Sequence, residues 1–233
     1  MDKLTPPVSG SRYSVIRAII ITWMTLVILG AFLLDIPRMN ILEHTARNLY
    51  FHVPMWFTMM SMVLVSGIYS ARHLASGSRI TDIRARESAR VAAVFGVMGL
   101  ITGILWAKFT WYSGTSVWWN SDPRQSMAAI QLLIYGAYFF LRTTIDDNEK
   151  RGRIAAVYNL IAAATVPFLL YVLPRQMESL HPGADGNPAF SEITAPIMRA
   201  VFYPAVIGFI AIAWLLYRQR VRVAILKENL TSD

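Results

Sequence analysis

Residues 91–107 read VAAVFGVMGLITGILWA, a stretch of seventeen positions without a single Asp, Glu, Lys or Arg. A helix that crosses a bilayer needs about 20 mostly apolar residues, because lipid offers its backbone N–H and C=O groups no partners except one another. Arg90 and Lys108 flank the stretch, where their long side chains can reach the two membrane surfaces. The stretch therefore predicts one membrane-spanning helix.

Five more uncharged stretches of similar length follow the same pattern, at residues 18–34, 53–71, 125–141, 154–174 and 200–217. Of the 233 residues, 55% are hydrophobic and only 15% are charged, whereas soluble chains average about 25% charged residues. The first stretch is too long for the apolar core of a typical cleaved signal peptide, so we expect it to remain as a span. We predict an all-α, polytopic integral membrane protein. It would form a single domain over residues 1–233, with six transmembrane helices at about 13–34, 53–72, 90–109, 125–142, 154–174 and 199–217.

The basic residues are distributed unevenly between the two sides of this predicted bundle. Sixteen of the 22 Lys and Arg residues lie in the N-terminal tail, in the loops after the second and fourth stretches, and in the C-terminal tail. Cytoplasmic segments of membrane proteins are enriched in Lys and Arg. We therefore expect both termini in the cytoplasm, and the net charge of +8 then reflects topology rather than nucleic-acid binding. The loops after the first, third and fifth stretches would face outward, which in a two-membrane bacterium means from the inner membrane into the periplasm.

The outward segment after the third stretch is rich in tryptophan. Residues 106–123 read WAKFTWYSGTSVWWNSDP, and four of the seven tryptophans of the chain fall within 14 positions. An interfacial aromatic belt explains one or two of them, Trp106 in particular. The remaining density around Gly114 indicates a flat apolar platform that would suit a large planar ligand. Composition alone does not distinguish the aromatic belt from the platform.

Two histidines lie on the same outward side. His52 stands in the sequence YFHVP (residues 50–54) at the mouth of the second stretch, and His181 lies in the longest outer loop. A pair of neutral imidazoles can ligate a haem iron from both faces, although a lone loop histidine is more often an ordinary polar residue. His44 is a reserve ligand on the same side. His73 is 21 residues beyond His52 on one helix, about 31 Å away, and cannot share a site with it.

Three outward arginines, Arg47, Arg124 and Arg175, could pair with an anionic group such as a haem propionate, because guanidinium suits a carboxylate. Plain interfacial anchoring is the alternative for each. The chain has no cysteine, which excludes thiolate metal sites and covalent haem attachment through C-x-x-C-H. It also lacks a P-loop, an H-E-x-x-H motif and a G-x-S-x-G motif.

With these motifs the chain resembles the haem exporter protein C (CcmC) family of haem-handling proteins. Three segments carry the resemblance: residues 50–54, the Trp-rich segment ending in Asp122-Pro123, and the pair Leu180-His181 with Gly183. The spacing of the Trp segment departs from the W-G-T-x-W-x-W-D pattern that is common in the family. Here two residues separate Trp111 from Gly114, and two more separate Trp119 from Asp122.

The resemblance implies a function and a site. The protein would bind haem b non-covalently at the periplasmic face and deliver it to a CcmE-like haem chaperone for maturation of c-type cytochromes, presenting haem rather than acting as a conventional enzyme with catalytic residues. His52 and His181 would be the axial ligands of the haem iron. Trp111, Trp118, Trp119 and Asp122 would form the haem platform or dock the partner, and Arg47, Arg124 and Arg175 would contact the propionates.

The resemblance also implies partners, namely CcmA- and CcmB-like subunits of an ATP-binding cassette transporter, a CcmD-like small membrane protein, and membrane lipid. Three alternatives stay open. A haem transporter would carry haem across the bilayer, a membrane b-type cytochrome would transfer electrons, and an assembly subunit would have an empty groove. The second usually places histidine pairs inside the spans, and here no histidine lies inside an uncharged stretch.

Overall fold

The computed structural model describes residues 10–37, 43–181, 193 and 195–231. Within these ranges the chain is helical and contains no strand, as the sequence predicts. The elements are α1 (Ser11–Leu33), η1 (Glu43–Asn48), α2 (Leu49–Ser76), α3 (Arg79–Thr110), α4 (Pro123–Leu141), α5 (Asn148–Pro167), the π-helix η2 (Phe168–Val172), the 3₁₀-helix η3 (Leu173–Gln176) and α6 (Pro196–Thr231).

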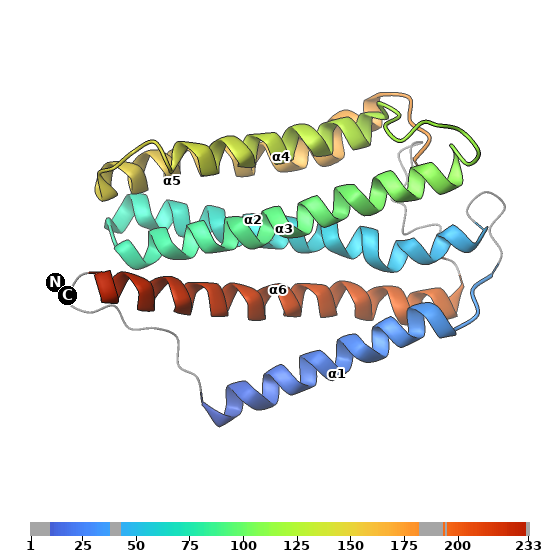
Figure 1. Cartoon of the computed structure of the whole chain (residues 1–233), viewed down its shortest axis with the longest axis horizontal. Helices are drawn as coiled ribbons and strands as arrows, with labels where there is room; N and C mark the ends of the chain where they lie inside the picture. Colours follow the sequence, from blue (N-terminus) through green and yellow to red (C-terminus); the bar gives the residue numbers. More distant parts are fainter. Residues whose placement is uncertain (1–9, 38–42, 182–192, 194, 232–233) are drawn as a thin grey trace.

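Consecutive helices run in opposite directions along one bundle (Figure 1). The pair α2 and α3 lies between α6 on one side and α4 with α5 on the other, and α1 is outermost, inclined against α6. One end of the bundle gathers the start of α2, the end of α3 and the start of α4, and we call it the histidine end. The opposite end gathers the end of α2, the start of α3 and the end of α4, and we call it the basic end.

Five helical segments are long and apolar enough to cross a membrane. They are Tyr13–Leu33, Thr45–Ser76, Arg79–Thr110, Asn148–Gln176 and Pro196–Leu230. Helix α4 is not among them. Its 19 residues are long enough, but Arg124, Gln125 and Ser126 in its first turn lower its mean hydropathy. The chain is therefore a membrane protein, and the sixth crossing remains a prediction.

The helices extend beyond the predicted spans. Helix α3 begins at Arg79 rather than near residue 90, and α6 continues to Thr231 rather than ending near residue 217. Arginine, alanine and glutamate favour helix, so the chain stays helical after it has left the apolar layer. An uncharged stretch thus marks the part of a helix suited to lipid and not its ends. The turn between α2 and α3 is correspondingly short, and Gly77 ends α2 with a φ of 64°.

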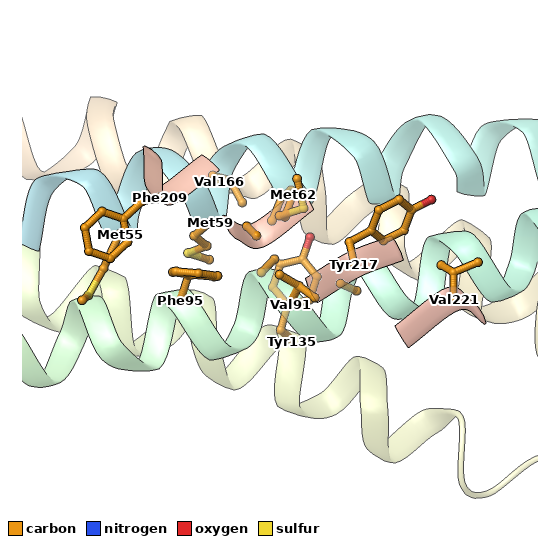
Figure 2. Close-up of a cluster of buried hydrophobic side chains, with 14 of the residues drawn as sticks. Met55, Met59, Met62, Val91, Phe95, Tyr135, Val166, Phe209, Tyr217 and Val221 are labelled. Carbon is orange, nitrogen blue, oxygen red and sulfur yellow. The ribbon is translucent and has the colours of Figure 1, made fainter. Parts of the chain in front are cut away.

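The core of the bundle is apolar and rich in methionine (Figure 2). Met55, Met59 and Met62 are spaced along one face of α2 and meet Phe95 of α3 and Phe209 of α6. Unbranched methionine side chains fill irregular gaps between helices, which is the packing role that their spacing suggests.

Polar side chains add interhelical hydrogen bonds inside the same core. Asn159 of α5 donates through Nδ2 to Ser66 Oγ at 2.7 Å and to Ser70 Oγ at 2.8 Å, both on α2. Thr165 of α5 donates to Gln131 Oε1 of α4 at 3.0 Å. In an apolar environment such bonds hold helices together, since a separated polar group would lose its partner.

At the basic end a buried carboxylate joins three helices. Asp82, near the start of α3, is only 2% exposed and receives both terminal nitrogens of Arg142, at 2.7 and 2.8 Å. Arg79 adds a third bond at 2.7 Å and also pairs with Glu228 of α6. The ends of α3, α4 and α6 are therefore tied together by charge-assisted hydrogen bonds.

Glu87 forms a second buried centre one turn further along α3. It is 1% exposed and accepts from Arg86 at 2.8 Å, from Arg90 at 2.6 Å and from Arg220 of α6 at 2.9 Å. Several arginines that the sequence presents as topology signals thus also neutralise buried acids.

Replacement of Asp82 by Ala should destabilise the protein by about 3–5 kcal/mol, because it leaves the buried Arg142 guanidinium without its anion. Glu149→Ala is the matched control. The Glu149 side chain is 80% exposed and its Oε1 lies 3.9 Å from Arg153 Nε, which is a long ion pair. Its loss should therefore cost about 1 kcal/mol or less. Thermal unfolding of both variants in detergent measures the difference, and equal shifts would show that the Asp82 pair contributes no more than a surface pair.

Candidate functional site

A cavity of about 320 Å³ lies at the histidine end, within the size range of small-molecule sites. Its wall comes from α2, α3, the loop after α3, α4, η2, η3 and the segment that follows η3. The lining residues are His52, Val53, Trp56, Phe57, Met60, Gly99, Leu100, Gly103, Trp106, Ala107, Trp111, Asn120, Asp122, Arg124, Gln125, Ala128, Leu170, Tyr171, Arg175 and His181.

His52 enters this cavity from the first turns of α2 and is 8% exposed. Its Nδ1 lies 3.0 Å from the carbonyl oxygen of Gly99 and 3.1 Å from Thr102 Oγ1, both on α3. A carbonyl oxygen can only accept, so Nδ1 carries the proton and Nε2 keeps its lone pair. This tautomer leaves Nε2 able to ligate a metal.

Glycines on α3 allow the two helices to approach this closely. A Cβ at Gly103 would lie 2.8 Å from His52 Cε1, and a Cβ at Gly99 would lie 2.9 Å from Trp56 Cε2. Carbon atoms that are not bonded do not approach one another so closely. A larger residue at Gly103 would displace the His52 imidazole, and one at Gly99 would displace the Trp56 indole. The local sequence GLITG (residues 99–103) therefore sets the position of His52 as much as α2 does.

His181 faces His52 although 129 residues separate them in sequence. The two ring centroids are 6.3 Å apart, and the ring planes are inclined by 42°. Two imidazoles that bind one metal ion through bonds of about 2 Å have ring centres about 6 Å apart. The pair is thus suitably spaced to hold a single metal ion between its rings.

Two tryptophans stand edge-on to His52. Its ring centroid is 5.6 Å from that of Trp106 and 6.3 Å from that of Trp56. Trp106 is buried and donates through Nε1 to Thr45 Oγ1 at 3.1 Å, so it belongs to the cavity wall as well as to the end of α3. Sequence reasoning assigned Trp106 to an interfacial belt and did not single out Trp56. The position of Trp56 one helical turn after His52 was the available signal.

The Trp-rich loop divides into two parts. Trp111 lines the cavity, whereas Trp118 and Trp119 do not line it and are 55% and 45% exposed. Lys108 organises the turn between them. Its ammonium group donates to the carbonyl oxygens of Tyr112 and Thr115 and lies 5.5 Å from the ring centroid of Trp118.

The three candidate arginines lie in different parts of the structure. Arg124 and Arg175 line the cavity, and the guanidinium carbon of Arg175 lies 3.5 Å from the ring centroid of Tyr171. Arg47 is not in the lining and donates instead to the carbonyl oxygens of Ala31 and Leu34, at 2.7 and 2.9 Å. It thereby satisfies open carbonyls at the end of α1.

Asp122 lies at the edge of the cavity and begins α4. Its Oδ1 accepts from the backbone N–H of Arg124 at 2.9 Å, which is the usual bond of an N-terminal cap.

Gln125 and Tyr171 also line the cavity, and the sequence alone offers no reason to choose them. Gly183 lies outside the described residues, as does the side chain of His44.

Comparison with known proteins identifies relatives along the whole chain. The family model of CcmC, Heme exporter protein C, matches residues 7–233. Heme exporter protein C of Paracoccus denitrificans is 26% identical over 188 residues, covering 81% of this chain and 76% of that protein. The Escherichia coli K12 protein of the same name is 27% identical over 180 residues, covering 77% and 70%. Cytochrome c biogenesis protein CcsA of Prochlorococcus marinus is 36% identical over a shorter segment of 97 residues, covering 40% of this chain and 30% of that protein.

Two Gly→Ala variants should change stability in opposite directions. Gly103→Ala brings a methyl group against His52 and should cost about 1–3 kcal/mol through overpacking. Gly136→Ala, on α4, has nothing within 4 Å of the new methyl and should stabilise by about 0.5–1 kcal/mol, because alanine favours helix over glycine. Thermal unfolding in detergent measures both, and stabilisation by Gly103→Ala would contradict the close approach of α2 and α3.

Proposed function

The chain belongs to the CcmC (Heme exporter protein C) family, and from this membership we propose that it binds haem in the cavity at the histidine end and hands it to another protein. Membership of the family supports a role in haem handling during maturation of c-type cytochromes. The finer proposal is delivery to a periplasmic, CcmE-like haem chaperone. It rests on the chemistry of the cavity.

The observation that carries this proposal is the histidine pair. Histidines that ligate a metal usually donate their second ring N–H to a carbonyl or carboxylate, which fixes the tautomer and the orientation of the ring. His52 makes that bond to the carbonyl oxygen of Gly99, and the ring centroid of His181 lies 6.3 Å from that of His52. We assign both imidazoles as axial ligands of the haem iron.

The remaining wall fits the rest of a haem. Trp56, Trp106 and Trp111 offer apolar surface for the porphyrin, and large aromatic side chains favour contact with a flat conjugated ring. Arg124 and Arg175 would meet the propionates, because guanidinium groups form charge-assisted bonds with carboxylates. Arg47 is less suited to that role, since it already caps α1.

Transfer requires haem that can leave. The chain has no cysteine, so haem b would be held without a thioether bond. Trp118 and Trp119 are exposed beside the cavity and would dock the chaperone, since exposed aromatic residues are enriched where proteins meet. CcmA- and CcmB-like transporter subunits, a CcmD-like small membrane protein and lipid would complete the assembly around the bundle.

We propose six crossings of a bacterial inner membrane, with both termini in the cytoplasm and the histidine end at the periplasmic face. The arginines around Asp82 and Glu87 support this proposal, because they concentrate at the basic end and Lys and Arg mark cytoplasmic segments.

Single cysteine variants of this cysteine-free chain test the orientation. Ser116→Cys lies in the exposed Trp-rich loop and Thr144→Cys in the exposed turn after α4, at the opposite end. A membrane-impermeant maleimide added to spheroplasts should label Ser116→Cys and leave Thr144→Cys unlabelled until the membrane is opened. The reverse pattern would invert the proposed topology.

Absorbance spectra test the haem site. The purified wild-type protein should show a Soret band, and His52→Ala should lose most of it, because its axial bond and buried ring are removed together. His73→Ala is the control, since His73 is a buried histidine of the same helix at the basic end. If His52→Ala and His181→Ala both bind haem and load a CcmE-like chaperone as the wild type does, the ligand assignment is wrong.

A further inference from the structure

The carboxylate of Asp122 joins two parts of the cavity wall. Its Oδ1 caps α4 through the N–H of Arg124, while its Oδ2 accepts from Ser179 Oγ at 2.8 Å and from the backbone N–H of Leu180 at 3.1 Å. Fifty-seven residues separate Asp122 from Ser179. One acidic side chain therefore fixes the segment after η3 to the start of α4.

This connection reaches His181 directly. Ser179 Oγ donates to Asp122 and at the same time accepts from the backbone N–H of His181 at 3.1 Å. Leu180, between Ser179 and His181, is 54% exposed. A charged acceptor makes the bonds of Asp122 stronger than bonds between neutral groups.

His52 is held in a different way. It is part of a 28-residue helix, and its ring is bonded to the backbone of a second helix. His181 lies in a segment outside the helices, and the bonds of Asp122 and Ser179 connect this segment to the start of α4. The two histidines are thus positioned by different means.

We propose that Asp122 is a positioning residue for His181. This inference rests on the proposed haem site. Asp122 would act through the segment that it holds and not through contact with the haem.

The test compares haem spectra of the full-length, detergent-purified protein. Asp122→Asn retains a good cap for α4 through its one oxygen, but the amide nitrogen cannot accept from Ser179 Oγ or from the N–H of Leu180, and the negative charge is lost. Ser179→Ala removes the bridging hydroxyl and Ser179→Thr keeps it. We expect Asp122→Asn and Ser179→Ala to keep their haem and to raise the ratio of five-coordinate high-spin to six-coordinate low-spin haem about tenfold, the effect of losing one charge-assisted bond. Ser179→Thr should match the wild type.

Added imidazole supplies a readout that a general loss of folding would not give. It should restore the low-spin spectrum of Asp122→Asn and of His181→Ala and leave the wild type unchanged. A wild-type spectrum for Asp122→Asn, beside a converted spectrum for His181→Ala, would overturn the positioning role and leave the haem site intact. Loss of haem from Asp122→Asn with the remainder still six-coordinate would also overturn it, because Asp122 would then contact the haem itself. If His52→Ala and His181→Ala both keep the wild-type spectrum, the proposed function fails instead.

Discussion

The site depends on one hydrogen bond, from His52 Nδ1 to the carbonyl oxygen of Gly99. A helical carbonyl already accepts from the residue four positions later, and the side chain of that later residue normally covers it. Here the later residue is Gly103, which has no side chain, so an imidazole from the neighbouring helix can lie against the helix and reach the oxygen. The bond orients the ring, selects its tautomer and requires α2 and α3 to pack in one register.

The two ends of the bundle satisfy their polar groups by different means. At the basic end, Asp82 and Glu87 are surrounded by arginines from three helices, and the buried charges compensate one another. At the histidine end, the side chains of His52, Asp122, Arg124 and Arg175 line a cavity. Charge pairs therefore connect the helices at one end of the bundle, and polar groups surround an open space at the other.

The sequence predicts the elements better than their limits or their contacts. Uncharged stretches predict the helices because lipid imposes that composition, but α3 and α6 extend well past them where arginine and glutamate are helical too. Sorting basic residues by side is enough to expect His52 and His181 at one end. The sequence cannot tell that Arg124 and Arg175 reach the cavity while Arg47 caps α1, because that depends on how loops return to the bundle. The sequence also could not tell that Trp106 lines the cavity, since a belt residue and a wall residue look alike in sequence.

Helix α4 is the helix whose own transfer from water into lipid is least favourable, because its first turn contains Arg124, Gln125 and Ser126 and its interior contains the buried Gln131. Helix α4 packs against α3 and α5, and the bond from Thr165 to Gln131 connects it to α5. The side of the cavity that holds Arg124 and Asp122 therefore depends on this packing and not on the apolar character of α4 alone. Because α2 and α3 come earlier in the chain, the bond between His52 and Gly99 can form before that side of the cavity is in place.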